Sequence, residues 1–258
     1  MISALRTLGY RTVMLLEHLG HMAAFVGQIG LNALRRPFRF GRLVMEIFDV
    51  GVLSLAIVCL SGATVGAVLG LQGYNTLTRF GAEGSLGAVV GLTLVRELGP
   101  VFTALLVTGR AGSAMAAEIA SMVTTEQLDG LRMMSIDPVD FVVTPKALAM
   151  LIVMPMLNVL FILFAFFGGY VIGVELLGVD GGTYVTSLED AITFEDDVAG
   201  TLLKSVVFGL LVGLIATYRG YTAEPTSAGV SAATTGTVVT ASVTILIFDY
   251  VITALWGV

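Results

Sequence analysis

Long uncharged stretches alternate with short charged ones along most of this 258-residue chain. A helix needs about 20 apolar residues to cross a hydrocarbon core of roughly 30 Å. Residues 50–78, 147–174, 198–218 and 225–248 carry at most one charge each, and 84–108 is interrupted only by Arg96 and Glu97. The pattern predicts an all-α integral membrane protein with five spans, at about 50–75, 84–108, 147–174, 198–219 and 232–256.

Composition agrees with this pattern. Hydrophobic residues make up 56% of the chain and charged residues only 12%, whereas soluble domains are about one quarter charged. Because the first predicted span begins at about residue 50, we divide the chain into an N-terminal region, 1–45, and a single membrane domain, 46–258.

A shorter uncharged run, 18–34, lies in the N-terminal region. It contains two histidines and is flanked by Arg11 and by four arginines between positions 35 and 42. These features favour an amphipathic helix lying in the membrane interface. A spanning or re-entrant helix is the alternative.

The positions of lysine and arginine predict the orientation, because cytoplasmic loops are enriched in both. Six of the 13 precede the first span; Arg110, Arg132 and Lys146 lie between spans two and three, and Arg219 between spans four and five. Acidic residues gather instead at 180–197, between spans three and four. We expect a cytoplasmic N-terminus, a periplasmic C-terminus and a small periplasmic element at 180–197.

Arg96 and Glu97 are the first candidate site. A charged side chain at bilayer depth costs roughly 2.5–3.5 kcal/mol on insertion scales, so such residues usually line a cavity or meet a partner. Neighbouring helical residues point about 100° apart, so each needs its own partner, and Asp249 is a candidate for Arg96. Pro100 favours a kink in this helix. The alternative is a buried ion pair that only fixes helix packing.

Gly62, Gly66 and Gly70 share one face of the first span. This small-xxx-small spacing lets two helix backbones approach closely. The face could pack within the chain or form a seam between two copies, and the sequence leaves both open.

The segment between spans two and three, 108–138, is the most informative loop. Thr124 and Gln127 have the spacing of a capping box, and Asp137–Pro138 marks the predicted helix end. A short amphipathic helix here could shield the bundle or dock into a groove on a soluble partner. Met133 and Met134 suit an adaptable interface.

Motifs for catalysis are missing from the sequence. It contains neither a GxxxxGK[ST] phosphate loop nor HExxH, and its two histidines, His18 and His21, have no third metal ligand beside them. No histidine lies in a predicted span, so the membrane centre offers no histidine base to activate a nucleophile. We expect a transport subunit without a metal, a cofactor or an ATPase motif of its own, and not an enzyme.

Three stretches resemble the MlaE/YrbE family of permeases, which belong to ABC transporters that maintain lipid asymmetry. They are LVRELGPVFTALLVTGRAGSAMAAEIASMVTTEQLDGLRMMSIDP at 94–138, KSVVFG at 204–209 and GYTAEPTSAGVSAATTGTVV at 220–239. The resemblance implies a homodimeric permease in a Gram-negative inner membrane that moves glycerophospholipid between that membrane and a periplasmic carrier route. It also implies three partners: an ABC ATPase subunit that binds ATP and Mg, a STAS-domain protein and a hexameric MCE-domain ring.

The resemblance assigns roles to particular residues. Lipid binding is expected at Arg96 and Glu97 of RELGP and at Leu69, Leu77 and Phe80, with Asp249 added as the candidate ionic partner. ATPase coupling is expected in the helix predicted at 125–135, at Glu126, Gln127, Asp129, Leu131, Arg132, Met133 and Met134.

Two other functions are compatible with the residues alone. An ion-coupled secondary transporter would use Glu97 as a proton carrier, and a membrane scaffold would only anchor a soluble partner.

Overall fold

The computed structural model describes residues 20–33 and 40–256, and every regular element in these ranges is a helix. Five continuous helical stretches are long and apolar enough to cross a membrane: Phe40–Phe80, Glu83–Thr124, Val139–Leu176, Phe194–Tyr221 and Ser227–Leu255. The predicted all-α class and the number of spans are confirmed. Each of the five stretches is longer than the span predicted for it.

The long stretches consist of α-helices with π-helical turns between them or at their ends, and the short helices α7 and α9 lie between stretches. The α-helices are α2 (Phe40–Ile47), α3 (Leu53–Leu77), α4 (Leu86–Thr93), α5 (Gly99–Val107), α6 (Ser113–Thr124), α7 (Gln127–Met133), α8 (Thr144–Tyr170), α9 (Gly181–Ala191), α10 (Ala199–Tyr221) and α11 (Ser227–Trp256). The π-helical turns are Phe48–Val52, Leu94–Leu98, Thr108–Gly112, Val139–Val143, Val171–Leu176 and Phe194–Val198.

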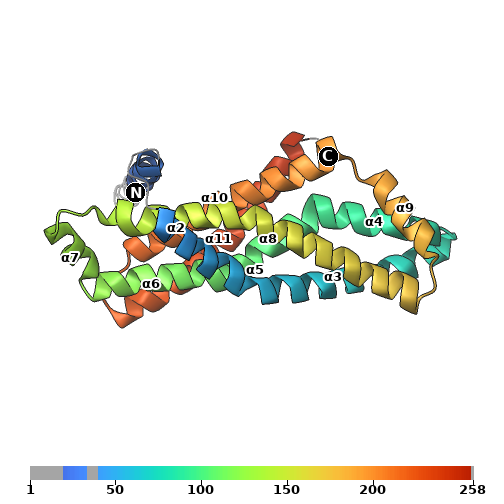
Figure 1. Cartoon of the computed structure of the whole chain (residues 1–258), viewed down its shortest axis with the longest axis horizontal. Coiled ribbons are helices and arrows are strands. Elements are labelled where there is room, and N and C mark those ends of the chain that lie inside the picture. Colours follow the sequence, from blue (N-terminus) through green and yellow to red (C-terminus); the bar gives the residue numbers. More distant parts are fainter. Residues whose placement is uncertain (1–19, 34–39, 257–258) are drawn as a thin grey trace, which may run out of the picture.

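The central helix of the bundle is α8, which packs along α3 on one side and α10 on the other (Figure 1). In turn α10 packs against α6 and α11, and α4 packs against α9. The short helices α7 and α9 lie at opposite ends of the molecule (Figure 1). Side chains from α3, α8 and α10, among them Val58, Phe161 and Phe208, form one continuous buried core.

The glycine face of α3 is covered by α8 of the same chain. A Cβ on Gly62 would lie 2.5 Å from the carbonyl oxygen of Phe161, and one on Gly70 would lie 3.0 Å from that of Gly169. A Cβ on Gly66 would overlap the backbone of Ala165. Of the two uses that the sequence left open for this face, the structure shows packing within the chain, because α8 occupies it.

The segment treated as a loop after span two is mostly helix. The second long stretch runs on to Thr124, so Arg110 lies inside it. Helix α6 forms because Met115, Ala116 and Ile119 recur at helical spacing and are buried, and α6 packs against α10 and α11.

The predicted capping box is wrong. Thr124 ends α6, and its hydroxyl donates to the carbonyl of Ala120 at 2.9 Å. Glu126 precedes α7 in the left-handed region, with φ 57°, and no side chain caps α7. The helix ends at Met133, before the predicted end at Asp137–Pro138.

The acidic segment between spans three and four is partly ordered as α9. Asp180 caps this helix by accepting a hydrogen bond of 2.8 Å from the Thr183 amide. Hydrogen bonds from Thr183 lower the pKa of Asp180. Tyr184 is buried against α4, and its ring meets Tyr170 edge-on at 5.7 Å. The exposure of α9 to the periplasm stays a prediction.

Residues 20–33 form a helix, as the amphipathic pattern predicts. Its buried face carries Phe25, Ile29 and Asn32, and the first two pack against residues of α8 and α10. The location of this helix in a membrane interface is untested, and His18 and the arginines at 35–39 lie outside the described residues. The boundary predicted after residue 45 falls inside α2.

Candidate functional site

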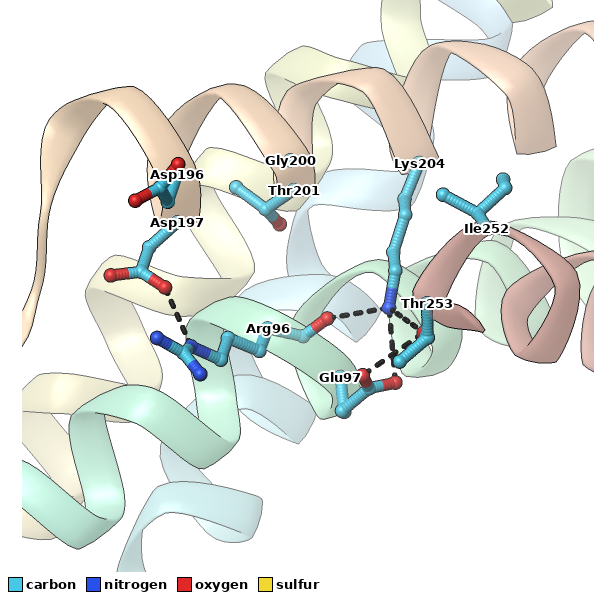
Figure 2. Close-up of a pocket in the computed structure, with 9 residues that line it drawn as sticks. All are labelled: Arg96, Glu97, Asp196, Asp197, Gly200, Thr201, Lys204, Ile252 and Thr253. Atoms are coloured by element: carbon cyan, nitrogen blue, oxygen red, sulfur yellow. Dashed lines mark hydrogen bonds and ion pairs between the residues drawn. The ribbon is translucent and has the colours of Figure 1, made fainter. Parts of the chain in front are cut away.

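Lys204 of α10 is the centre of an ionic network that joins three long helices (Figure 2). Its side chain is only 7% exposed. Its Nζ donates to the carbonyl of Arg96 and to Thr253 Oγ1, both at 2.8 Å. The same nitrogen lies 3.0 Å from Glu97 Oε2 and 3.1 Å from Asp249 Oδ1. One buried cation therefore neutralises two carboxylates from different helices.

Pro100 explains why the Arg96 carbonyl is available to Lys204. Proline has no N–H, so Pro100 cannot donate to the carbonyl four residues before it, which is that of Arg96. The chain forms a π-helical turn at Leu94–Leu98, which ends two residues before this proline. Such turns are frequent at functional sites. The kink signal in the sequence thus marks the position where the network forms.

Arg96 pairs with Asp197, at the start of the fourth long stretch. The Nε–Oδ1 distance is 2.6 Å, and the Asp197 side chain is 0% exposed. The other carboxylate oxygen of Asp197 accepts from the backbone amide and the hydroxyl of Thr193, at 2.7 and 3.0 Å. Of the three guanidinium nitrogens of Arg96, only Nε hydrogen-bonds to another described residue. The two terminal amino groups are therefore left for a ligand.

The predicted pairing of Arg96 with Asp249 is therefore wrong. Arg96 and Glu97 diverge around their helix, as neighbouring residues must, so Arg96 reaches Asp197 while Glu97 reaches α11. Asp249 still belongs to the network through Lys204. Lys204 and Asp197 are not among the site residues predicted from the sequence. Lys204 is the single charge in the uncharged stretch 198–218, and Asp197 is the last residue of the acidic segment 180–197.

A small cavity opens beside the network. Its enclosed volume is about 20 Å³, which is room for about one water molecule. Two cations, Arg96 and Lys204, and three carboxylates, Glu97, Asp196 and Asp197, line the cavity. The other lining residues are uncharged: Gly200, Thr201, Ile252 and Thr253. A larger polar group would enter only if α10 and α11 moved apart from the π-helical turn Leu94–Leu98, which carries Arg96 and Glu97.

The other predicted lipid-binding residues lie away from this cavity. Leu69 and Leu77 are partly buried in the core, and Phe80 is 79% exposed at the end of the first long stretch. The second long stretch begins at Glu83, three residues after Phe80, and rises about 20 Å at 1.5 Å per residue before it reaches Arg96 at the cavity. A separate cavity of about 250 Å³ lies near this end, lined by residues that include Tyr74, Glu83 and Asp180.

The predicted coupling residues form a compact surface on α7. Leu128 is buried beneath it and Leu131 is half-buried, while Met133 is 88% exposed. Arg132 pairs with Asp129 at 2.7 Å. The remaining members, Glu126, Gln127 and Met134, are exposed as well. The structure therefore brings these residues together, at the end of the molecule opposite α9 (Figure 1).

A second ionic cluster surrounds Lys146, which the span pattern placed in the segment between spans two and three. Its nearly buried Nζ lies 2.8 Å from Glu46 Oε2 and 2.8 Å from Glu118 Oε2. These contacts join α2, α6 and α8. The signal for this cluster was weak, because a lysine beside a predicted span end is more often solvated.

Comparison with known proteins places these features in a family context. The family model described as "Permease MlaE" matches residues 43–255. The "Intermembrane phospholipid transport system permease protein MlaE" of Haemophilus influenzae is 46% identical over 231 residues, 90% of this chain and 88% of the relative. A "Probable ABC transporter permease protein" of Rickettsia bellii is 38% identical over 256 residues, covering 99% and 98%. The chloroplastic "Protein TRIGALACTOSYLDIACYLGLYCEROL 1" of Arabidopsis thaliana is 31% identical over 228 residues, covering 88% and 65%.

Proposed function

The chain belongs to the MlaE permease family, and we propose that it is the membrane-spanning subunit of an ABC transporter for glycerophospholipids. In this proposal it moves lipid between the bacterial inner membrane and a periplasmic carrier route, and so maintains the lipid asymmetry of the outer membrane. The proposal is supported by its 46% identity to a relative named as an intermembrane phospholipid transport permease.

The ionic network around Lys204 is the observation that carries the proposal. An amphiphile needs a polar contact for its headgroup within an otherwise apolar surface. Arg96 offers two terminal amino groups, a geometry that suits phosphate. In the most apolar part of α11 only 11% of residues are buried, so acyl chains or a second copy of the chain could cover that face. We propose a homodimer whose rearrangement widens the cavity.

Partners supply what this chain lacks. We propose that an ABC ATPase subunit, which binds ATP and Mg, docks on α7, with a STAS-domain protein attached to it. A hexameric MCE-domain ring would contact the opposite end of the permease, near α9. The opposite positions of α7 and α9 support this arrangement (Figure 1).

Conservative substitutions in the network test lipid handling without leaving a buried charge unpaired. Arg96→Lys keeps a cation beside Asp197 but removes the guanidinium fork. We expect lipid transport by the complex in proteoliposomes to fall about tenfold or more, because a hydrogen bond to a charged group contributes about 1.5–3 kcal/mol. Complex assembly should persist, and Asp49→Asn, at an exposed carboxylate of the first long stretch outside the network, is the matched control.

The same assay separates the competing functions. Lipid movement by the permease alone, driven by a proton gradient without the ATPase, would overturn the proposal in favour of a secondary transporter that uses Glu97. Unchanged lipid asymmetry in cells that carry Arg96→Lys and Glu97→Gln would favour a scaffold.

Charge reversal on α7 tests ATPase docking. We expect Asp129→Lys to abolish co-purification of the ATPase, because it changes the charge at the centre of the proposed docking surface. The melting temperature should stay unchanged, because the side chain is exposed and its pair with Arg132 is a surface ion pair. Glu189→Lys on exposed α9 serves as the control. Intact co-purification with Asp129→Lys and also with Arg132→Glu would show that the docking site is elsewhere.

A further inference from the structure

We infer that the helix over residues 20–33 braces α7, with Phe25 as its positioning residue, and thereby sets how much lipid is transported per ATP. The role in transport rests on the proposed docking of an ATPase at α7. The brace itself rests on contacts that reach α7 and the segment after it.

Phe25 connects the N-terminal helix to the end of α10. It is 7% exposed. Its ring centroid lies 5.5 Å from that of Tyr218, in an edge-on arrangement, and 5.4 Å from that of Tyr221. Aromatic pairs at this separation attract one another beyond the simple burial of their surface. The last turn of α10 is thus held by a residue nearly 200 positions earlier in the chain.

Tyr221 passes this contact on to α7. Its hydroxyl accepts a hydrogen bond of 2.7 Å from a terminal nitrogen of Arg132, and the other terminal nitrogen of Arg132 donates to Asp129 at 2.7 Å. The two charged residues of the proposed docking surface are therefore oriented by a tyrosine that packs on Phe25.

A second contact reaches the segment that follows α7. Gln28 Nε2 donates to Asp137 Oδ2 at 3.2 Å. The other oxygen of Asp137 accepts from the Val139 amide at 2.9 Å, where the third long stretch begins. The N-terminal helix thus touches both the residues that contact α7 and the connection by which α7 joins α8.

Helix α7 needs such external support. It has only seven residues, and isolated helices of that length are unstable in water. Glu126 before it and Ser135 after it both have left-handed backbone conformations, φ 57° and φ 60°, which are unfavourable for residues other than glycine. Within α7 only Leu128 is fully buried. Apart from Leu128 and Leu131, which pack in the main core, the position of α7 depends on the contacts that Arg132 and the adjoining segments make.

The brace can be removed without dismantling the bundle. Phe25→Ala removes the ring, and Tyr221→Phe keeps the ring but removes the hydroxyl that Arg132 binds. Leu31→Ala is the matched control, because Leu31 lies on the same helix and is 60% exposed. Phe25→Tyr restores an aromatic ring and should rescue the Phe25 position.

The first measurement is hydrogen exchange of the α7 amides in the purified full-length chain. We expect about tenfold faster exchange in Phe25→Ala and Tyr221→Phe, and the rate of the unsubstituted chain in Leu31→Ala and Phe25→Tyr. The double variant Phe25→Ala with Tyr221→Phe should match the more affected single variant, because both act through one path. Unchanged exchange in both single variants would overturn the brace, whether or not the proposed function holds.

The second measurement is lipid transported per ATP hydrolysed by the full complex in proteoliposomes. We expect a fall of about threefold to tenfold in Phe25→Ala and Tyr221→Phe, with the ATPase still co-purifying. A ratio equal to that of Leu31→Ala would overturn the role of the brace in coupling. A failure of the proposed function is distinguishable, because the complex without substitutions would then move no lipid.

Discussion

Lys204→Met will destabilise the protein more than any other single change in the ionic network. Methionine roughly preserves the volume of the side chain but removes the charge that neutralises Glu97 and Asp249. Removing one partner of a buried ion pair costs about 3–5 kcal/mol, because the remaining charge stays in a poorly solvated place. We expect a large drop in folded protein and in melting temperature in detergent, measured by size-exclusion chromatography after heating.

The double variant Lys204→Met with Asp249→Asn is the informative control. It removes the charge of Asp249, the more buried of the two carboxylates that lose their cation. The double variant should therefore recover much of the lost stability while transport stays low. Lys204→Arg should fold better than Lys204→Met, because the charge is retained. If Lys204→Met melts at the same temperature as the unsubstituted protein, the buried network contributes little and the carboxylates are neutralised in another way.

Lys204 also illustrates what the sequence could and could not predict about the site. Arg96 and Glu97 stand out because uncharged residues surround them on both sides. With a span start at residue 198, Lys204 lay about 9 Å from the end at 1.5 Å per residue, where a lysine can reach the interface. The helical stretch begins at Phe194 instead, so the residue lies about 15 Å inside it.

Hydropathy identified five spans because each contains about 20 apolar residues, and the structure agrees. The helix ends were harder to predict, because a helix can continue past the bilayer as long as its neighbours bury one face. Helix α6 continues beyond the predicted end of the second span, because Met115 and its alanines pack against α10 and α11. Hydropathy indicates which residues suit an apolar surrounding, whereas the length of a helix is also determined by tertiary packing.

Partners across the bundle were outside the reach of sequence patterns. The spacing of Gly62, Gly66 and Gly70 shows that something approaches α3 closely, but the same spacing serves a dimer or an internal contact. Likewise, Arg96 required an acidic partner, for which the sequence suggested Asp249, whereas the partner in the structure is Asp197 from a different helical stretch. Only the packing of α10 between α8 and α11 decides between them.

Gly66→Ala is expected to have the largest packing effect in the bundle. The added Cβ would overlap the carbonyl oxygen of Ala165 and lie 2.7 Å from its Cα. Both are backbone atoms of α8, so no side-chain rotation relieves the clash and the two helices must separate. Overpacking usually costs about 1–3 kcal/mol and occasionally more, and we expect at least the upper value here, measured as a loss of melting temperature in detergent.

Gly73→Ala provides a matched comparison on the same helix. Its Cβ would come 2.8 Å from Leu86 Cδ1, the end of a side chain that can change rotamer, so we expect a much smaller loss. Gly168→Ala approaches the same contact from α8, because its Cβ would overlap the backbone of Ala63; it should therefore reproduce the effect of Gly66→Ala. Equal melting temperatures for Gly66→Ala and Gly73→Ala would mean that α3 and α8 are not in backbone contact. The glycine face of α3 would then again be free to form a seam between two copies.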